Sequence, residues 1–67
     1  MLTKEQAIEH MLSGGKVTHS YFMEDEWMTM VNPKLILFQD GVEINPDDFW
    51  SIRIDGWESG YSIVNKP

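Results

Sequence analysis

The sequence contains no cysteine and only two histidines, His10 and His19. The absence of cysteine excludes disulfide bonds and thiolate metal ligands. Two histidines are too few for a typical zinc site unless carboxylates supply further ligands. We therefore expect neither a metal site nor a cofactor.

Basic residues are also scarce, with five Lys and Arg against 11 Asp and Glu, which gives a net charge of −6. The basic residues are spread along the chain and form no patch: Lys4, Lys16, Lys34, Arg53 and Lys66. A surface of this charge repels nucleic-acid backbones and anionic lipid headgroups. We therefore expect no direct nucleic-acid partner and no membrane partner.

Long apolar runs are missing, since the longest, at residues 35–38, is far too short to span a membrane. The N-terminal residues do not show the pattern of a signal peptide. These features predict a cytoplasmic location, in a bacterium or, for a phage protein, in its host.

A chain of 67 residues can form only one domain, over residues 1–67. Its apolar content is high for that length, with three Trp, three Phe, two Tyr and five Met. Trp, Tyr and Met are enriched at protein interfaces. We therefore expect a homo-oligomer.

The pattern of polar and apolar residues predicts an α+β fold, with one N-terminal helix packed on an antiparallel β meander of about five to six short strands. Thr3 and Gln6 have the spacing of a capping box, and Gly14 with Gly15 ends the helix, which places it at residues 3–13. We expect Ile8, Met11 and Leu12 to lie in the core.

The remaining chain is predicted to be mainly strands joined by turns. Asn45 and Pro46 are typical of a second helix start, although only about one helical turn is expected there. Strands are predicted at residues 16–22, 27–31, 35–38, 42–44, 51–54 and 57–64.

No catalytic arrangement is recognisable, so we do not expect an enzyme. The serines lie outside any known nucleophile motif, and the neighbours His19 and Ser20 point to opposite faces of a strand. The Gly14-Gly15-Lys16 segment lacks the spacing of a phosphate-binding loop and ends a helix instead of starting one.

Three features could serve binding, and each also has a purely structural interpretation. The acidic residues 24–26 form either a solvated hairpin tip or a mimic of phosphate groups. Trp50, Trp57 and Tyr61 belong either to the core or to an interface. Arg53 beside these aromatic residues suits a planar or anionic ligand, or else a surface ion pair.

Residues 6–18 and the Gly56-Trp57-Glu58 segment resemble the small phage proteins that counter Thoeris defence. That family has a short N-terminal helix of the type "EAIxxxLxxGKKVT", an aromatic strand and a C-terminal "DWE"-like strand. The resemblance implies a homo-oligomer that sequesters a nucleotide-derived immune signal in pockets between subunits, without hydrolysing it.

Three interpretations follow. The first is a sponge for a nucleotide-derived molecule, with stacking and hydrogen-bonding groups from Lys16, Thr18, His19, Tyr21, Arg53, Trp57 and Tyr61. The second is an acidic, anti-CRISPR-like inhibitor that binds a host defence protein as a nucleic-acid mimic. The third is a structural or regulatory phage protein without a role in defence.

Overall fold

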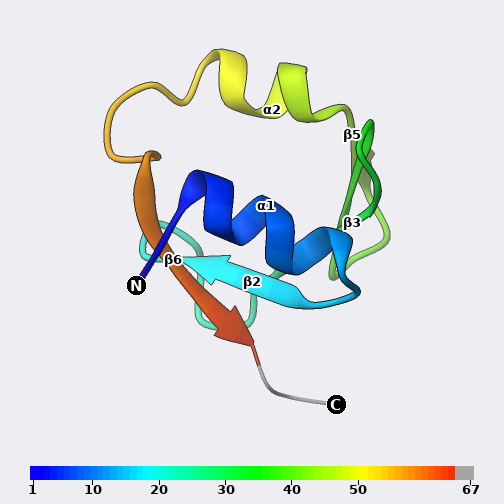
Figure 1. The fold of residues 1–67 in the computed structure, drawn as a ribbon, viewed down its shortest axis with the longest axis horizontal. Coiled ribbons are helices and arrows are strands. Elements are labelled where there is room, and N and C mark those ends of the chain that lie inside the picture. The colour runs from blue at the N-terminus through cyan, green and yellow to red at the C-terminus, as the bar shows by residue number, and fades with distance from the viewer. Residues whose placement is uncertain (65–67) are drawn as a thin grey trace.

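The computed structural model describes residues 1–64 and has the expected α+β fold, in which a curved sheet wraps around one helix (Figure 1). The sheet consists of six antiparallel strands in the order β1-β6-β2-β3-β4-β5. Their bounds are β1 (Leu2–Thr3), β2 (Lys16–His19), β3 (Met28–Asn32), β4 (Leu35–Phe38), β5 (Glu43–Ile44) and β6 (Ser59–Val64). The helices are α1 (Lys4–Leu12) and α2 (Pro46–Ser51).

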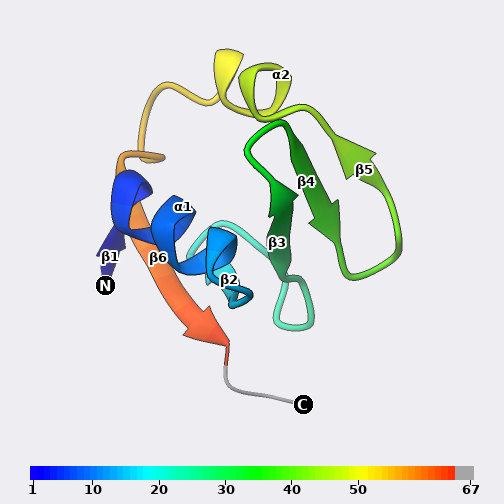
Figure 2. The same cartoon turned by 45° about the vertical axis from the view of Figure 1, so that its right-hand side comes forward.

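The predicted meander is present as the four consecutive strands β2 to β5. The chain then crosses back, and β6 pairs with the free edge of β2, where His19 lies opposite Tyr61. The short strand β1 extends the sheet beyond β6. As Figure 2 shows, α1 lies between the two ends of the curved sheet and α2 closes the open top.

Helix α1 begins with the capping box expected from the sequence. The Thr3 hydroxyl accepts a hydrogen bond from the Gln6 backbone N–H at 3.2 Å, and the Gln6 side chain accepts one from the Thr3 N–H at 2.9 Å. These bonds satisfy two N–H groups at the helix start. At the other end Gly14 adopts a φ of 101°, a conformation that favours glycine.

Ala7 and Met11 form the buried stripe of α1, whereas Ile8 is only half-buried. The prediction that Leu12 lies in the core is wrong, because this side chain is 44% exposed. The apolar positions 7, 8, 11 and 12 make a stripe wider than the surface that the sheet covers, so its edge remains in contact with solvent.

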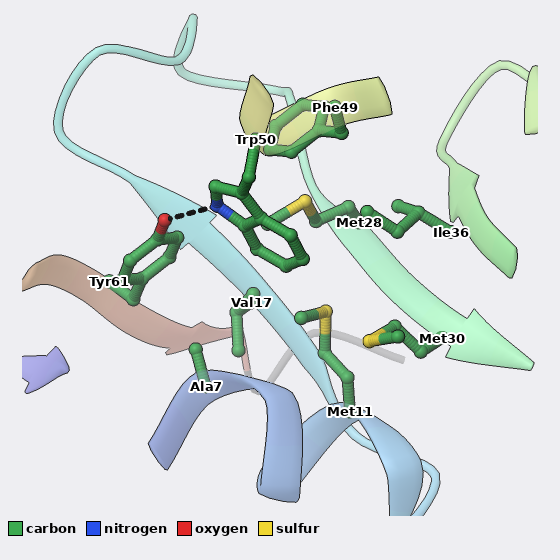
Figure 3. Close-up of a cluster of buried hydrophobic side chains, with 9 residues drawn as sticks. All are labelled: Ala7, Met11, Val17, Met28, Met30, Ile36, Phe49, Trp50 and Tyr61. Atoms are coloured by element: carbon green, nitrogen blue, oxygen red, sulfur yellow. Dashed lines mark hydrogen bonds between the residues drawn. The ribbon is translucent and has the colours of Figure 1, made fainter. Parts of the chain in front are cut away.

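The core lies between the two helices and the inner face of the sheet (Figure 3). Phe49 and Trp50 reach down from α2, and Ala7 and Met11 reach up from α1. The strands complete this core with Val17, Met28, Met30, Ile36 and Tyr61. Each large apolar side chain buried in this way contributes about 1.5–3 kcal/mol to stability.

The prediction of a strand at residues 51–54 is wrong, because Ser51 ends α2 and a loop follows it. Helix α2 starts as expected, since the Asn45 side chain accepts a hydrogen bond from the Asp47 N–H at 2.8 Å, but it continues to Ser51. Residues 52–58 then form a loop without strand pairing. Burial of Phe49 and Trp50 against the core explains why the helix extends beyond one turn.

Candidate functional site

The seven residues predicted to bind a ligand fall into two groups on opposite faces of the sheet. Along β2, Val17 and His19 are buried on the inner face, while Lys16 and Thr18 point to the outer face. The inner group also contains residues from the two loops beside β2 and β6. Its members are His19, Tyr21, Arg53, Trp57 and Tyr61.

His19 is the centre of the inner group. Its imidazole stacks on the Trp57 ring, with centroids 4.0 Å apart and planes only 16° from parallel. Tyr61 approaches the imidazole edge-on at 4.6 Å, and Tyr21 approaches Trp57 edge-on at 5.4 Å. Such offset and edge-on pairs are the favoured aromatic geometries. These four rings form one aromatic cluster, in which His19 and Tyr61 are buried.

The polar atoms of His19 are used within the chain. Nε2 lies 2.8 Å from the Ser59 carbonyl oxygen and 3.1 Å from that of Gly56, while Nδ1 accepts a hydrogen bond from the Tyr21 N–H at 3.0 Å. This set of partners matches the neutral tautomer with hydrogen on Nε2. His19 thus ties the loop before β6 to the end of β2. It is not placed to contact a ligand or to act as a base.

Tyr61 is completely buried and fully hydrogen-bonded. Its hydroxyl donates to the Trp57 carbonyl oxygen at 2.8 Å and accepts from the Trp50 indole N–H at 2.9 Å. Burial raises the pKa of the phenol above its usual value. The Trp50 hydrogen bond lowers the pKa, but the effect of burial is larger. Tyr61 therefore supports the site from beneath rather than facing solvent.

Arg53 remains partly exposed between two aromatic rings. The guanidinium carbon lies 4.0 Å from the Phe49 ring centroid and 5.5 Å from that of Trp57. Nη1 donates a hydrogen bond to the Phe49 carbonyl oxygen. This bond uses one of the five guanidinium N–H donors and anchors the planar group at the C-terminal end of α2.

Tyr21 and Trp57 are the accessible aromatic residues beside Arg53. Tyr21 is 64% exposed and Trp57 is half-buried. Gly56 allows the close approach of the two loops, because a Cβ atom there would overlap the Tyr21 ring. We call the surface formed by Tyr21, Arg53 and Trp57 the guanidinium–aromatic surface.

Lys16 and Thr18 are separated from this surface by the sheet itself. The Lys16 ammonium lies 4.3 Å from the centroid of the Trp27 ring, a cation–π contact. The Thr18 hydroxyl donates to the Glu26 carbonyl oxygen at 2.8 Å. Within one subunit, these two residues cannot reach a ligand bound at Arg53.

A hollow of about 240 Å³, which the sequence did not predict, lies on the other side of Arg53. Three phenylalanine rings contribute to its wall, and two carboxylates stand among its lining residues. The lining comprises Phe22, Glu26, Phe38, Gln39, Asp40, Val42, Ile44, Phe49 and Arg53. These residues come from three separate stretches of the chain, residues 22–26, 38–44 and 49–53, and no spacing in the sequence links them.

Metal-binding clusters and membrane-spanning helices are both absent within residues 1–64. In that part of the chain, no three His, Asp or Glu side chains gather in a way that could hold a metal ion. None of the helices formed there has the length and apolar character needed to cross a membrane. Compared with known proteins, the chain matches no family model, no curated protein and no solved structure.

Proposed function

We propose that the protein is a non-enzymatic phage or prophage anti-defence protein that sequesters a nucleotide-derived immune signalling molecule in the host cytoplasm. The observation that carries this proposal is the guanidinium–aromatic surface, where an anchored Arg53 lies between rings and beside the exposed Tyr21. The resemblance of residues 6–18 to Thoeris anti-defence proteins supports the same function.

The chemistry of this surface suits a ligand that joins a flat base to a phosphate. A base stacked on an aromatic side chain contributes about 1–3 kcal/mol. The planar guanidinium matches phosphate geometry and forms charge-assisted hydrogen bonds, which are stronger than neutral ones. Because the net charge is −6, a local cation is required to overcome a repulsive overall field.

A second subunit would complete the pocket. The surface of one chain is open, and the residues on either side of Arg53, Ile52 and Ile54, are 78% and 73% exposed. Apolar side chains of this size gain stability when they are buried against a partner. We propose that a homo-oligomer covers them and encloses the ligand between subunits, where Lys16 or Thr18 of a neighbouring copy could join the site.

Isothermal titration against cyclic dinucleotides, cyclic trinucleotides and ADP-ribose derivatives tests the proposal. We expect one class to bind, and we expect Arg53→Ala and Trp57→Ala each to weaken that binding by about 1–3 kcal/mol. Lys34→Ala is the matched control, because it removes one positive charge from an exposed turn away from the site. Absence of heat with every class, or equal losses in the control, would contradict the proposal.

A second function, an acidic inhibitor that binds a host defence protein, is favoured by the exposed carboxylates of Glu24 and Asp25. Exposed charges of this kind accelerate association with a basic surface by long-range steering. Changing residues 24–26 to Gln or Asn would then slow association, most strongly at low salt. If the sponge is the correct function, the same change leaves nucleotide binding unchanged or slightly stronger.

A further inference from the structure

The hollow beside Arg53 is a second candidate binding site, and it differs in charge from the guanidinium–aromatic surface. Its walls include Phe22 and Phe38, both half-buried, and the buried Phe49. Phe38 and Phe49 lie 5.6 Å apart between centroids with their planes tilted by 47°. The rings therefore offer faces as well as edges to a side chain that enters.

The two carboxylates of the hollow are held in place by backbone hydrogen bonds. Glu26 Oε1 accepts from the Met23 N–H at 2.9 Å, and Asp40 Oδ1 accepts from the Val42 N–H at 3.1 Å. The two turns are also joined, because the Trp27 N–H donates to Gln39 Oε1 and the Gln39 N–H donates to the Trp27 carbonyl oxygen. Each carboxylate keeps a second oxygen that can accept a hydrogen bond from a ligand.

An aromatic hollow with fixed carboxylates favours a cation with a flat or apolar body. Ring faces attract guanidinium and ammonium groups, and a carboxylate pairs with both. The molecule's own Arg53 already shows the first contact, with its guanidinium carbon 4.0 Å from the Phe49 centroid. An anionic ligand would instead meet two carboxylates against one guanidinium.

We propose that this hollow receives an arginine or lysine side chain from a basic segment of a partner protein. The charge of −6 on the whole chain steers such a segment toward the hollow. The cationic group is then held by two aromatic rings, Phe22 and Phe38, and by the free oxygens of two carboxylates, Glu26 and Asp40. The inserted cation lies on the carboxylate side, away from Arg53. A second copy of this chain is a poor occupant of the hollow because it offers no basic segment, since its five basic residues are spread along the chain. This proposal does not depend on the nucleotide site.

The test is an NMR titration of the intact protein with a hexa-arginine peptide, acetylated and amidated at its ends. The comparison is the same peptide in which neutral citrulline replaces each arginine. We expect the amide signals of Phe22, Phe38, Asp40 and Val42 to shift with the arginine peptide. We expect binding of the citrulline peptide to be weaker by about 10-fold or more, because citrulline keeps the shape of arginine but not its charge.

The double variant Glu26→Gln and Asp40→Asn distinguishes binding at the hollow from attraction of the peptide by the overall negative charge. Both replacements keep the oxygen that accepts the turn hydrogen bond, so they remove charge without removing the turns. We expect about 10-fold weaker binding of the hexa-arginine peptide, on the scale of two charge-assisted contacts. The control, Glu5→Gln with Glu9→Gln on α1, changes the net charge equally and should change affinity by less than about twofold.

Three outcomes would overturn the proposal. One is equal weakening in both double variants, which means that only the overall charge attracts the peptide. Another is equal binding of the citrulline peptide. The third is a set of shifts that lies away from the hollow. None of these results bears on nucleotide binding at Arg53 and Trp57, so the two proposals can fail separately.

Discussion

At the scale of single residues, Tyr61 connects the core to the candidate site. Its hydroxyl joins the Trp50 indole to the Trp57 backbone, so one side chain links α2, β6 and the loop that holds the accessible aromatic ring. His19 adds a second link, because its imidazole stacks on Trp57 and contacts the Ser59 and Gly56 carbonyl oxygens. The position of Trp57 is therefore set by two buried polar side chains.

Removal of the Tyr61 hydroxyl should destabilise the fold. We expect Tyr61→Phe to lower the free energy of unfolding by about 1–3 kcal/mol, because the buried Trp50 N–H loses its acceptor. Tyr21→Phe, at an exposed position, should change it by less than about 0.5 kcal/mol. Urea denaturation of both variants measures the difference, and equal stability of the two would contradict this role of Tyr61.

The raised pKa of Tyr61 predicts a loss of stability at alkaline pH. Because the phenol holds its proton more tightly when folded than when unfolded, its contribution is complete below about pH 10 and is lost as the pH rises toward the folded value. In Tyr21→Phe, Tyr61 is the remaining tyrosine. The ultraviolet absorbance of its phenolate should then appear above about pH 10 and together with unfolding. Phenolate formation in the folded state at the usual pKa would contradict the prediction.

Of the seven residues expected to bind a ligand, five lie together and two, Lys16 and Thr18, do not. The sequence also did not show how deeply each residue is buried. Strand alternation places His19 and Thr18 on opposite faces of β2, whereas the expected contrast with Ser20 is not tested by alternation, because Ser20 lies in the turn after β2. The sequence could not show that the imidazole Nε2 contacts the carbonyl oxygens of Gly56 and Ser59, because these residues follow much later in the chain. Contacts of that range depend on the crossover of β6 to β2.

At the scale of elements, α1 provides a test of the packing because neighbouring residues differ sharply in burial. Met11 is fully buried and Leu12 is 44% exposed. We expect Met11→Ala to cost about 2–5 kcal/mol of stability and Leu12→Ala less than about 1 kcal/mol. Chemical denaturation gives both values. A larger cost at Leu12 than at Met11 would mean that the helix docks through a different face.

The end of α1 gives a second test at this scale. Gly14 has a φ of 101°, and the space where a Cβ atom would lie is open, so only backbone strain opposes a substitution. We expect Gly14→Ala to cost about 1–2 kcal/mol. Gly14→Asn should cost less, because asparagine tolerates left-handed conformations better than alanine. Thermal unfolding of both variants would show the order, and an equal or reversed order would contradict it.

Element boundaries were predicted well where local chemistry decides them and poorly where tertiary packing does. The capping box at Thr3 and the Asn45-Pro46 helix start are local, and both are present. The prediction of a strand at residues 51–54 is wrong because Phe49 and Trp50 of α2 are buried in the core, and the helix extends through Ser51. The short strand β1 was missed because two residues carry no periodic pattern, and only its pairing with β6 defines it.

At the scale of the whole molecule, apolar exposure supports self-association. Several large apolar side chains remain more than 60% exposed, among them Tyr21, Met23, Ile52 and Ile54. We expect light scattering at tens of micromolar to report a dimer or a larger oligomer. Ile52→Ser with Ile54→Ser should shift the protein toward a monomer while leaving it folded, because neither residue belongs to the core. A monomeric parent protein would remove the basis for a pocket between subunits.

We propose that the protein captures a nucleotide-derived anion without altering it. The most direct measurement is mass spectrometry of small molecules released by heat from the protein purified from cells with active nucleotide-signalling defences. We expect an intact phosphate-containing nucleotide derivative to be released from the unaltered protein and to be strongly depleted from Arg53→Ala. Release of no such molecule, or of equal amounts from Arg53→Ala, would contradict it.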